Sequence, residues 1–230
     1  MVYLKYSIIV PMYNEEKRFN SFIPKLSNFL SKNLKDYELI FVNDGSKDRT
    51  LEILKRLECK NKVIVTYQVN HGKGYAVKKG ILSAKGDYIL FIDADGSIPT
   101  QEIPRMFEKL KNYDVVIGDR EQARSVVKRS FTRKITSFLF NNYSRLLFDT
   151  NVIDHLCGFK GFRRKVALSL FKNLKSNRWI FDVEILCKIK KEGYSLYRLP
   201  INWIHKGDSK MKFLDPLKIF FDLINLRMKI

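Results

Sequence analysis

Two aspartates, Asp93 and Asp95, stand one residue apart at the end of an apolar run, residues 88–92, and are followed by Gly96 and Pro99. In an extended chain both side chains project to the same side, with their Cα atoms roughly 7 Å apart. Two carboxylates held this close raise each other's pKa unless a cation lies between them. A hard divalent cation such as Mg²⁺ or Mn²⁺ takes oxygen ligands and shares them with substrate phosphates. The pair therefore predicts a metal site, with a simple turn at Asp95 and a helix cap at Asp93 as the structural alternative.

Polar clusters follow two further apolar runs, as PMYNEE (residues 11–16) and NDGSKD (residues 43–48). Asp44 in the second cluster could accept a hydrogen bond from a nucleobase N–H, although NDGS is also a good turn sequence. In HGKGYAVKKG (residues 71–80), Lys73 lies between two glycines ahead of a helical segment. Free backbone N–H groups and this ammonium could together hold a diphosphate.

The segments that must position these residues alternate between strand and helix patterns. Short apolar, β-rich runs predict strands at 6–11, 37–42, 62–67, 88–92 and 113–117. Between the first four, helical spacing occupies 15–30, 48–57 and 75–84. This alternation predicts an α/β fold with a mostly parallel central sheet covered by helices on both faces. In the usual winding the fourth strand returns beside the first, so the ends of strands one, two and four share one crevice.

The chain changes character after Arg120. Residues 121–165 hold ten Lys or Arg against three acidic residues, and the stretches 131–148 and 213–230 are basic and amphipathic. We interpret 1–230 as a single domain with a nucleotide-binding half, 1–120, and an acceptor-binding half, 121–230. The two amphipathic stretches are either ordinary packed helices or helices that lie on an anionic membrane surface.

Composition narrows the classes of partner. The 230 residues are 45% hydrophobic and carry a formal net charge of +19, which favours anionic partners: nucleic acid, acidic membrane or phosphorylated substrates. A nucleic-acid-binding module is the alternative of another class, but no helix-turn-helix, RNP-type or zinc-finger motif supports it. Three dispersed cysteines predict neither disulfides nor a zinc site. No apolar run approaches about 18 residues, so we expect a cytoplasmic protein, peripheral on a membrane, without a transmembrane helix.

The order PMYNEE, NDGS, HGKG, DADGSIP and GDR resembles the family 2 glycosyltransferases of the GT-A fold. The later segments DHLCGFKGF (154–162), RWIFDVEIL (178–186) and INWIHKGDSK (201–210) are similar to those of the dolichyl-phosphate glucose synthases. The resemblance implies an inverting, Mg²⁺- or Mn²⁺-dependent transfer of one sugar, with glucose from UDP-glucose favoured, onto a polyprenyl (dolichyl) phosphate. A mannose synthase that uses GDP-mannose, or a relative with a soluble acceptor, is the alternative.

The resemblance also implies roles for individual positions. The residues expected to hold the nucleotide sugar are Pro11, Tyr13, Asn14, Glu16, Asp44, Lys73, Asp93, Ser209 and Lys210. The metal would lie on Asp93 and Asp95, and the acceptor phosphate on Arg120, Arg133 and Ser137. The residues expected to take part in catalysis are Asp95, Arg120, Arg133 and Asp182. Asp182 and Glu184 could instead pair with Arg178 and Lys188 on a solvated helix face.

Overall fold

The computed structural model of the protein describes residues 5–121, 127–128, 143, 147–148, 152, 154–204, 206 and 215–229. Its first half contains β1 (Tyr6–Met12), α1 (Glu16–Asn33), β2 (Tyr37–Asp44), α2 (Thr50–Arg56), β3 (Lys62–Tyr67), α3 (Lys73–Ser83), β4 (Tyr88–Ile92), α4 (Glu102–Leu110) and β5 (Val115–Asp119). Its second half contains β6 (Val127–Lys128), β7 (Phe159–Arg163), α6 (Arg164–Lys172), α7 (Phe181–Glu192), β8 (Leu196–Pro200), β9 (Trp203–Ile204) and α8 (Asp215–Lys229).

The central sheet has the strand order β3-β2-β1-β4-β7-β5-β8, and β6 and β9 form a separate parallel pair. Strands β3, β2, β1 and β4 are parallel neighbours, so the chain winds outward from β1 and then returns beside it. The predicted winding and the mostly parallel α/β sheet are therefore confirmed. The carboxyl ends of β1, β2 and β4 reach the same edge, as the crevice rule requires.

Strand β7 is the main departure from the expected order. It lies between β4 and β5 and runs antiparallel to both. The sequence analysis did not predict this strand, because its segment CGFKGF contains two glycines and a lysine, which are poor strand formers. Its residues are nevertheless buried from Phe159 to Phe162, so a charged side chain lies in the middle of the sheet.

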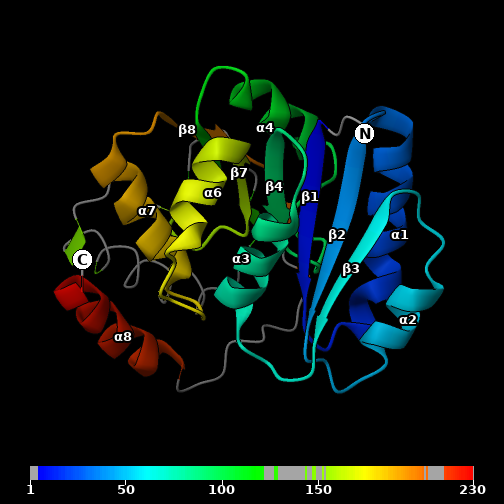
Figure 1. The fold of residues 1–230 in the computed structure, drawn as a ribbon, viewed down its shortest axis with the longest axis horizontal. Helices are drawn as coiled ribbons and strands as arrows, with labels where there is room; N and C mark the ends of the chain where they lie inside the picture. The colour runs from blue at the N-terminus through cyan, green and yellow to red at the C-terminus, as the bar shows by residue number, and fades with distance from the viewer. Residues whose placement is uncertain are drawn as a thin grey trace.

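Two hydrophobic layers cover the sheet, in agreement with the apolar character of its strands. Helices α1 and α4 pack on one face, where Phe19, Leu26 and Met106 are buried against β1, β2 and β4. Helices α3, α6 and α7 pack on the other, and Figure 1 shows α3 and α6 in front of the strands. The helices α1, α2 and α3 begin and end within a few residues of the predicted segments, whereas α4 and α6 were not anticipated.

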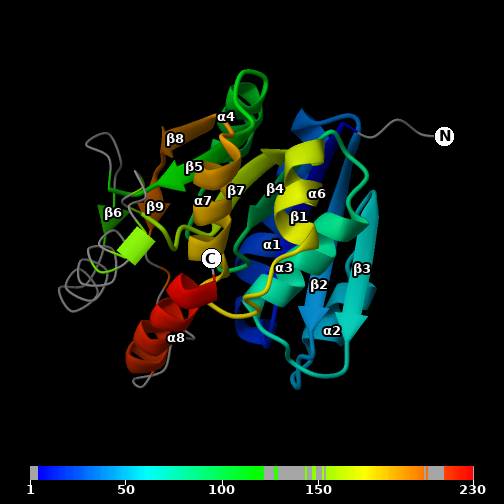
Figure 2. The same ribbon diagram turned by 60° about the vertical axis from the view of Figure 1, so that its left-hand side comes forward.

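Helix α8 joins the fold through a small third cluster. Leu223 and Leu226 pack with Val183 of α7 and with Phe148, and Figures 1 and 2 show α8 beyond α7, far from β3. None of the helices in the described part of the chain has the length and apolarity needed to cross a bilayer. Most of the amphipathic stretch 131–148 lies outside the described residues, so its proposed place on a membrane stays a prediction.

Candidate active site

The loops that follow β1 and β2 bind each other. Asn14, which adopts a left-handed conformation (φ 51°), accepts a hydrogen bond from the Lys47 amide at 2.8 Å, and its own amide donates to Ser46 Oγ at 3.0 Å. The carboxylate of Glu16 accepts a bond from the Arg49 amide. Asn14 and Glu16, two of the residues expected to hold the nucleotide, therefore hold the loops after β1 and β2 together. Pro11 and Tyr13, both half-buried, lie on the same segment.

Asp44 holds the loop between β3 and α3. Its Oδ1 accepts a hydrogen bond from the His71 amide at 3.0 Å, and its Oδ2 accepts bonds from the Gly72 amide at 2.8 Å and from Asn70 Nδ2 at 3.0 Å. The Tyr75 amide donates to Asn177 O at 3.1 Å. The backbone N–H groups of His71, Gly72 and Tyr75 are thus bonded within the protein, and the contact of this loop with a diphosphate stays a prediction. The nucleobase contact of Asp44 stays a prediction.

Lys73 is the part of that loop that faces the carboxylates. Its Nζ lies 2.6 Å from Asp93 Oδ1, with 17% of the lysine side chain and 33% of the aspartate side chain exposed. The same ammonium lies 5.9 Å from the centre of the Trp179 ring. Burial disfavours the charge, yet Asp93, Asp182 and Asp95 hold the pKa of Lys73 above its ordinary value. The lysine is thus a fixed cation at the edge of the sheet where the strands end.

Asp95 lies in a tight turn two residues beyond Asp93. Its Oδ1 accepts a hydrogen bond from the Ser97 amide at 2.9 Å, and Gly96 between them has φ +67°. A side chain at Gly96 would meet the Phe22 ring, so the turn requires glycine for both reasons. The Ser97 carbonyl accepts a bond from the Ile204 amide at 2.9 Å, which ties β9 to this turn.

Gly158 packs directly behind Asp93. The Asp93 amide donates to the Gly158 carbonyl at 3.1 Å, and a Cβ at position 158 would overlap the Asp93 carboxylate. Sequence reasoning missed this residue, because nothing local marks a glycine 65 positions away as a neighbour of Asp93. The CGFK motif to which it belongs was the one available signal.

Asp182 forms a buried ion pair with Lys160 of β7. The two side chains are 2% and 0% exposed, and Lys160 Nζ lies 2.6 Å from Asp182 Oδ1. Burial raises the pKa of Asp182, while the ammonium groups of Lys160 and Lys73 oppose that rise. The alternative in which Asp182 pairs with Arg178 on a solvated face is therefore wrong. Lys160 is a further residue that sequence reasoning missed.

Glu184, by contrast, makes the pair that the helical spacing predicted. Lys188 Nζ lies 2.9 Å from its Oε1, and the amides of Lys175 and Ser176 also donate to this carboxylate. Burial alone would raise the pKa of Glu184, but these hydrogen bonds hold it below its ordinary value. Glu184 thus fixes the segment that leads into α7.

Arg120 is engaged by an acid of its own chain. Its Nε and Nη2 donate to the two carboxylate oxygens of Asp154 at 2.7 and 2.6 Å, and its amide donates to Asp154 Oδ2 at 3.0 Å. Its guanidinium also lies 5.5 Å from the centre of the Trp203 ring. Burial opposes its charge, but Asp154 raises the pKa of Arg120 further above the ordinary arginine value. Asp154 therefore engages Nε and Nη2 of Arg120, and the contact of Arg120 with an acceptor phosphate stays a prediction.

Four expected site residues, namely Arg133, Ser137, Ser209 and Lys210, lie outside the described residues, so their roles stay predictions. The described residues contain no cluster of three or more acidic, histidine or cysteine side chains that could hold a metal. A cation on Asp93 and Asp95 would therefore need ligands beyond the described side chains, and substrate phosphates and water commonly supply them to Mg²⁺.

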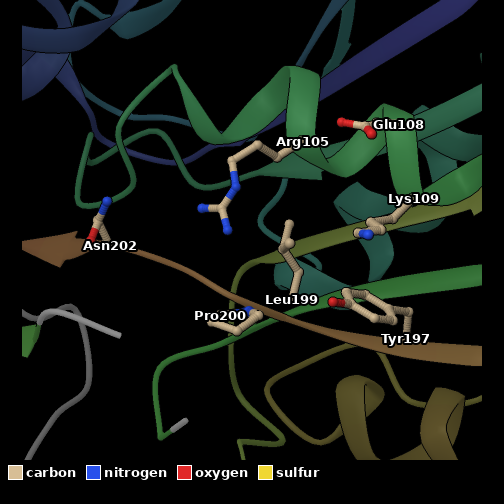
Figure 3. Close-up of a pocket in the computed structure, with 7 residues that line it drawn as sticks. All are labelled: Arg105, Glu108, Lys109, Tyr197, Leu199, Pro200 and Asn202. Atoms are coloured by element: carbon tan, nitrogen blue, oxygen red, sulfur yellow. The ribbon is translucent and has the colours of Figure 1, made fainter. Parts of the chain in front are cut away.

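A cavity of about 360 Å³ lies elsewhere, between α4 and β8, and none of the expected site residues lines it. Figure 3 shows its lining residues: Arg105, Glu108, Lys109, Tyr197, Leu199, Pro200 and Asn202. The Lys109 ammonium lies 5.0 Å from the Tyr197 ring centre, and Arg105 is paired with Glu102. With its cations so engaged, this cavity offers less chemistry than the strand-end site, which we take as the active site.

The profile of the family described as "Glycosyl transferase family 2" matches residues 7–171. A dolichyl-phosphate beta-glucosyltransferase of Dictyostelium discoideum is 34% identical to this chain, and the match covers 97% of this chain and 74% of that protein. A protein of the same name from Homo sapiens is 31% identical, with 97% and 75% covered.

The fold has solved counterparts. A glucosyl-3-phosphoglycerate synthase from Mycobacterium tuberculosis, crystallised with Mn²⁺, UDP and glucosyl-3-phosphoglycerate, superposes with a TM-score of 0.69, covering 99% of this chain and 81% of that one. A second structure of that synthase with UDP gives a TM-score of 0.70. At 18% and 16% sequence identity, these likenesses establish the fold alone.

Proposed function

The chain belongs to glycosyl transferase family 2, and from that premise we propose that it transfers glucose from UDP-glucose to a dolichyl or related polyprenyl phosphate. The observation that carries this proposal is the similarity of nearly the whole chain, 97% of it, to dolichyl-phosphate beta-glucosyltransferases. The site is compatible with it, because an ammonium and two carboxylates meet where a parallel sheet binds its ligands.

Asp93 and Asp95 would hold Mg²⁺ or Mn²⁺ together with the donor diphosphate. Lys73 takes Oδ1 of Asp93 and the Ser97 amide takes Oδ1 of Asp95, so each carboxylate retains its second oxygen for a cation. Both side chains are half-buried rather than sealed. These residues therefore fit a divalent ion, which when bound would neutralise charge on the departing diphosphate.

In the proposed reaction an oxygen of the acceptor phosphate attacks the anomeric carbon of glucose. The bond from that carbon to the diphosphate oxygen breaks, and UDP leaves with the electron pair. A phosphate monoester is already ionised at neutral pH, because its second pKa is about 6, so no general base is required. Direct attack inverts the anomeric centre, and the α-linked donor gives a β-linked product. Lys73 would stabilise the negative charge that grows on the leaving diphosphate.

The acceptor's lipid tail implies that the protein works at a membrane surface, and α8 suits such contact. Phe221 and Met228 are 62% and 73% exposed, while Leu223 and Leu226 between them are buried. The helix lies at the same end of the molecule as the arrowheads of β2 and β3 (Figures 1 and 2). We therefore include a peripheral position on the cytoplasmic face of a membrane in the proposal, with the exposed side chains of Phe221, Arg227 and Met228 against anionic lipid.

A donor and acceptor screen tests the reaction. The purified protein is incubated with Mn²⁺ and radiolabelled UDP-glucose or GDP-mannose, with either dolichyl phosphate or phosphoglyceric acid as acceptor. Labelled product is counted in the lipid extract and, after separation from the unreacted donor, in the aqueous phase. We expect lipid-soluble product from UDP-glucose and dolichyl phosphate. Faster transfer from GDP-mannose would indicate a mannosyl enzyme, and faster glucosylation of phosphoglyceric acid would indicate a soluble acceptor.

Vesicle flotation tests the membrane position separately. We expect the wild type to float with anionic vesicles at low salt and to be released as salt rises. Phe221→Asp should weaken flotation, while Val69→Asp is the matched control, because Val69 is equally exposed (63%) but lies on the loop after β3. Equal loss in both variants, or no flotation of the wild type, would contradict the role given to α8.

A further inference from the structure

Lys160 is a charged residue in the most buried part of the sheet. It lies on β7 opposite Phe91 of β4 and Ile117 of β5, and it has no exposed surface. Its ammonium lies 5.7 Å from the centre of the Phe91 ring. Lysine is almost never fully buried unless it is paired, because removing an ammonium from water is costly. An apolar residue at this position would avoid the free-energy cost of burying a charge, so the presence of lysine needs an explanation.

The ammonium of Lys160 is fully used. It donates to Asp182 Oδ1 at 2.6 Å, to the Cys157 carbonyl at 2.7 Å and to the His155 carbonyl at 3.1 Å. A lysine has three N–H donors, so each finds an acceptor. One acceptor belongs to the first turn of α7, and two belong to the segment that leads into β7. The lysine therefore joins the first turn of α7 to the segment that leads into β7.

Both parts lead to Asp93. The segment before β7 ends at Gly158, whose carbonyl accepts the Asp93 amide and whose missing side chain makes room for the Asp93 carboxylate. On the side of α7, Asp182 interacts electrostatically with Lys73, and Lys73 forms the ion pair with Asp93. The buried ammonium of Lys160 thus supports the Asp93 carboxylate in two ways, through Gly158 and through Lys73.

We propose that Lys160 is a positioning residue for the transfer reaction, which holds Asp93 in place through the 155–158 segment and through Asp182. The inference rests on the proposed function, because it assigns Asp93 to the nucleotide-sugar site. A role in folding alone is the competing explanation. The two differ in what happens to a folded molecule that lacks the ammonium, since only the positioning role changes turnover per folded enzyme.

The first test compares Lys160→Met with Lys62→Met. Lys62 is a matched control, because its ammonium also donates to three acceptors, the carbonyls of Leu54, Lys55 and Leu57, at the far edge of the sheet. Turnover is measured well below the melting temperature of each variant and expressed per folded molecule. We expect kcat to fall about tenfold or more in Lys160→Met, since small misplacements of reacting groups have large effects, and to stay near wild type in Lys62→Met. Equal kcat values per folded molecule would overturn the proposal.

A second comparison covers the case in which Lys160→Met does not fold. The double variant Lys160→Met with Asp182→Asn removes both buried charges, which proteins tolerate better than the loss of one. It is compared with Asp182→Asn alone. We expect the double variant to be a further several-fold less active, because the 155–158 segment has also lost its donor. Equal activity of the two would show that Lys160 does no more than neutralise Asp182, and it would overturn the proposal.

Calorimetry separates this inference from the proposed function. UDP and GDP are titrated into wild type and variants with Mn²⁺ present, and the nucleotide that binds wild type is used throughout. The inference predicts that nucleotide binds more weakly in the presence of Mn²⁺ to Lys160→Met than to wild type, and more weakly to the double variant than to Asp182→Asn. This holds whatever sugar or acceptor the enzyme uses. Wild type that binds nucleotide but transfers no glucose to lipid would refute the proposed function only. Unchanged affinity in the Lys160 variants would refute the positioning role.

Discussion

Replacement of Gly158 by alanine is the sharpest test of how Asp93 is held. Atoms in ordinary contact lie about 3.5–4.0 Å apart, but a Cβ at position 158 would lie 2.6 Å from Asp93 Oδ1 and closer still to Oδ2. The carboxylate or the strand must therefore move by roughly 1 Å, a displacement that can cost about a hundredfold in rate. Loss of the contact with Lys73 leads to a similar value, because a charge-assisted hydrogen bond contributes about 1.5–3 kcal/mol, or roughly 10- to 150-fold.

The assay measures kcat/KM for glucose transfer and the Mn²⁺-dependent affinity for UDP, beside thermal unfolding. Gly193→Ala is the matched control: Gly193 ends α7 with φ +70°, and a Cβ there would meet nothing within 4 Å. We expect the control to lose about 1 kcal/mol of stability from backbone strain and to keep its activity. Wild-type kcat/KM and UDP affinity in Gly158→Ala would refute the reasoning, since Asp93 would then not depend on the space beside it.

Three further predictions concern the metal, the loop after β3 and the buried thiols. Asp95→Ala should abolish metal-dependent transfer but change the melting temperature little, because the half-buried carboxylate accepts one hydrogen bond, at 2.9 Å from the Ser97 amide; turnover in excess EDTA would contradict the metal assignment. Asp44→Ala removes a buried carboxylate that accepts three hydrogen bonds, so urea unfolding should show a loss of about 3 kcal/mol and calorimetry should show weaker nucleotide binding. Burial raises the pKa of Cys157 to about 12, so iodoacetamide at pH 8 should alkylate it only after unfolding. An unfolded cysteine has a pKa of about 8.5, so above that pH the unfolded chain loses a proton that the folded chain keeps. The contribution of this thiol to the free energy of unfolding is therefore complete below about pH 8.5 and is lost as pH rises toward 12. Urea unfolding at pH 8 and 10 would detect the loss.

The sequence by itself determined the strand-end chemistry. Continuous apolar runs predict strands buried on both faces, and the polar residues that follow them, such as Asp44 and Asp93, must then lie at the carboxyl edge of a parallel sheet. That inference needs only local pattern and the handedness of βαβ units. The spacing of Glu184 and Lys188 was readable for the same reason, since residues four apart on a helix are always neighbours.

The tertiary structure alone decided the partners of these residues. Asp182 and Lys160 are 22 positions apart and Arg120 and Asp154 are 34 apart, and no periodicity connects them. Their pairing follows from the insertion of antiparallel β7 between β4 and β5, which brings a lysine under α7 and a glycine against Asp93. Strand order is set by how the whole set of apolar faces packs, a property of the complete chain. Local sequence pattern therefore places the strand-end carboxylates, whereas long-range packing determines which cations pair with buried acids such as Asp182 and Asp154.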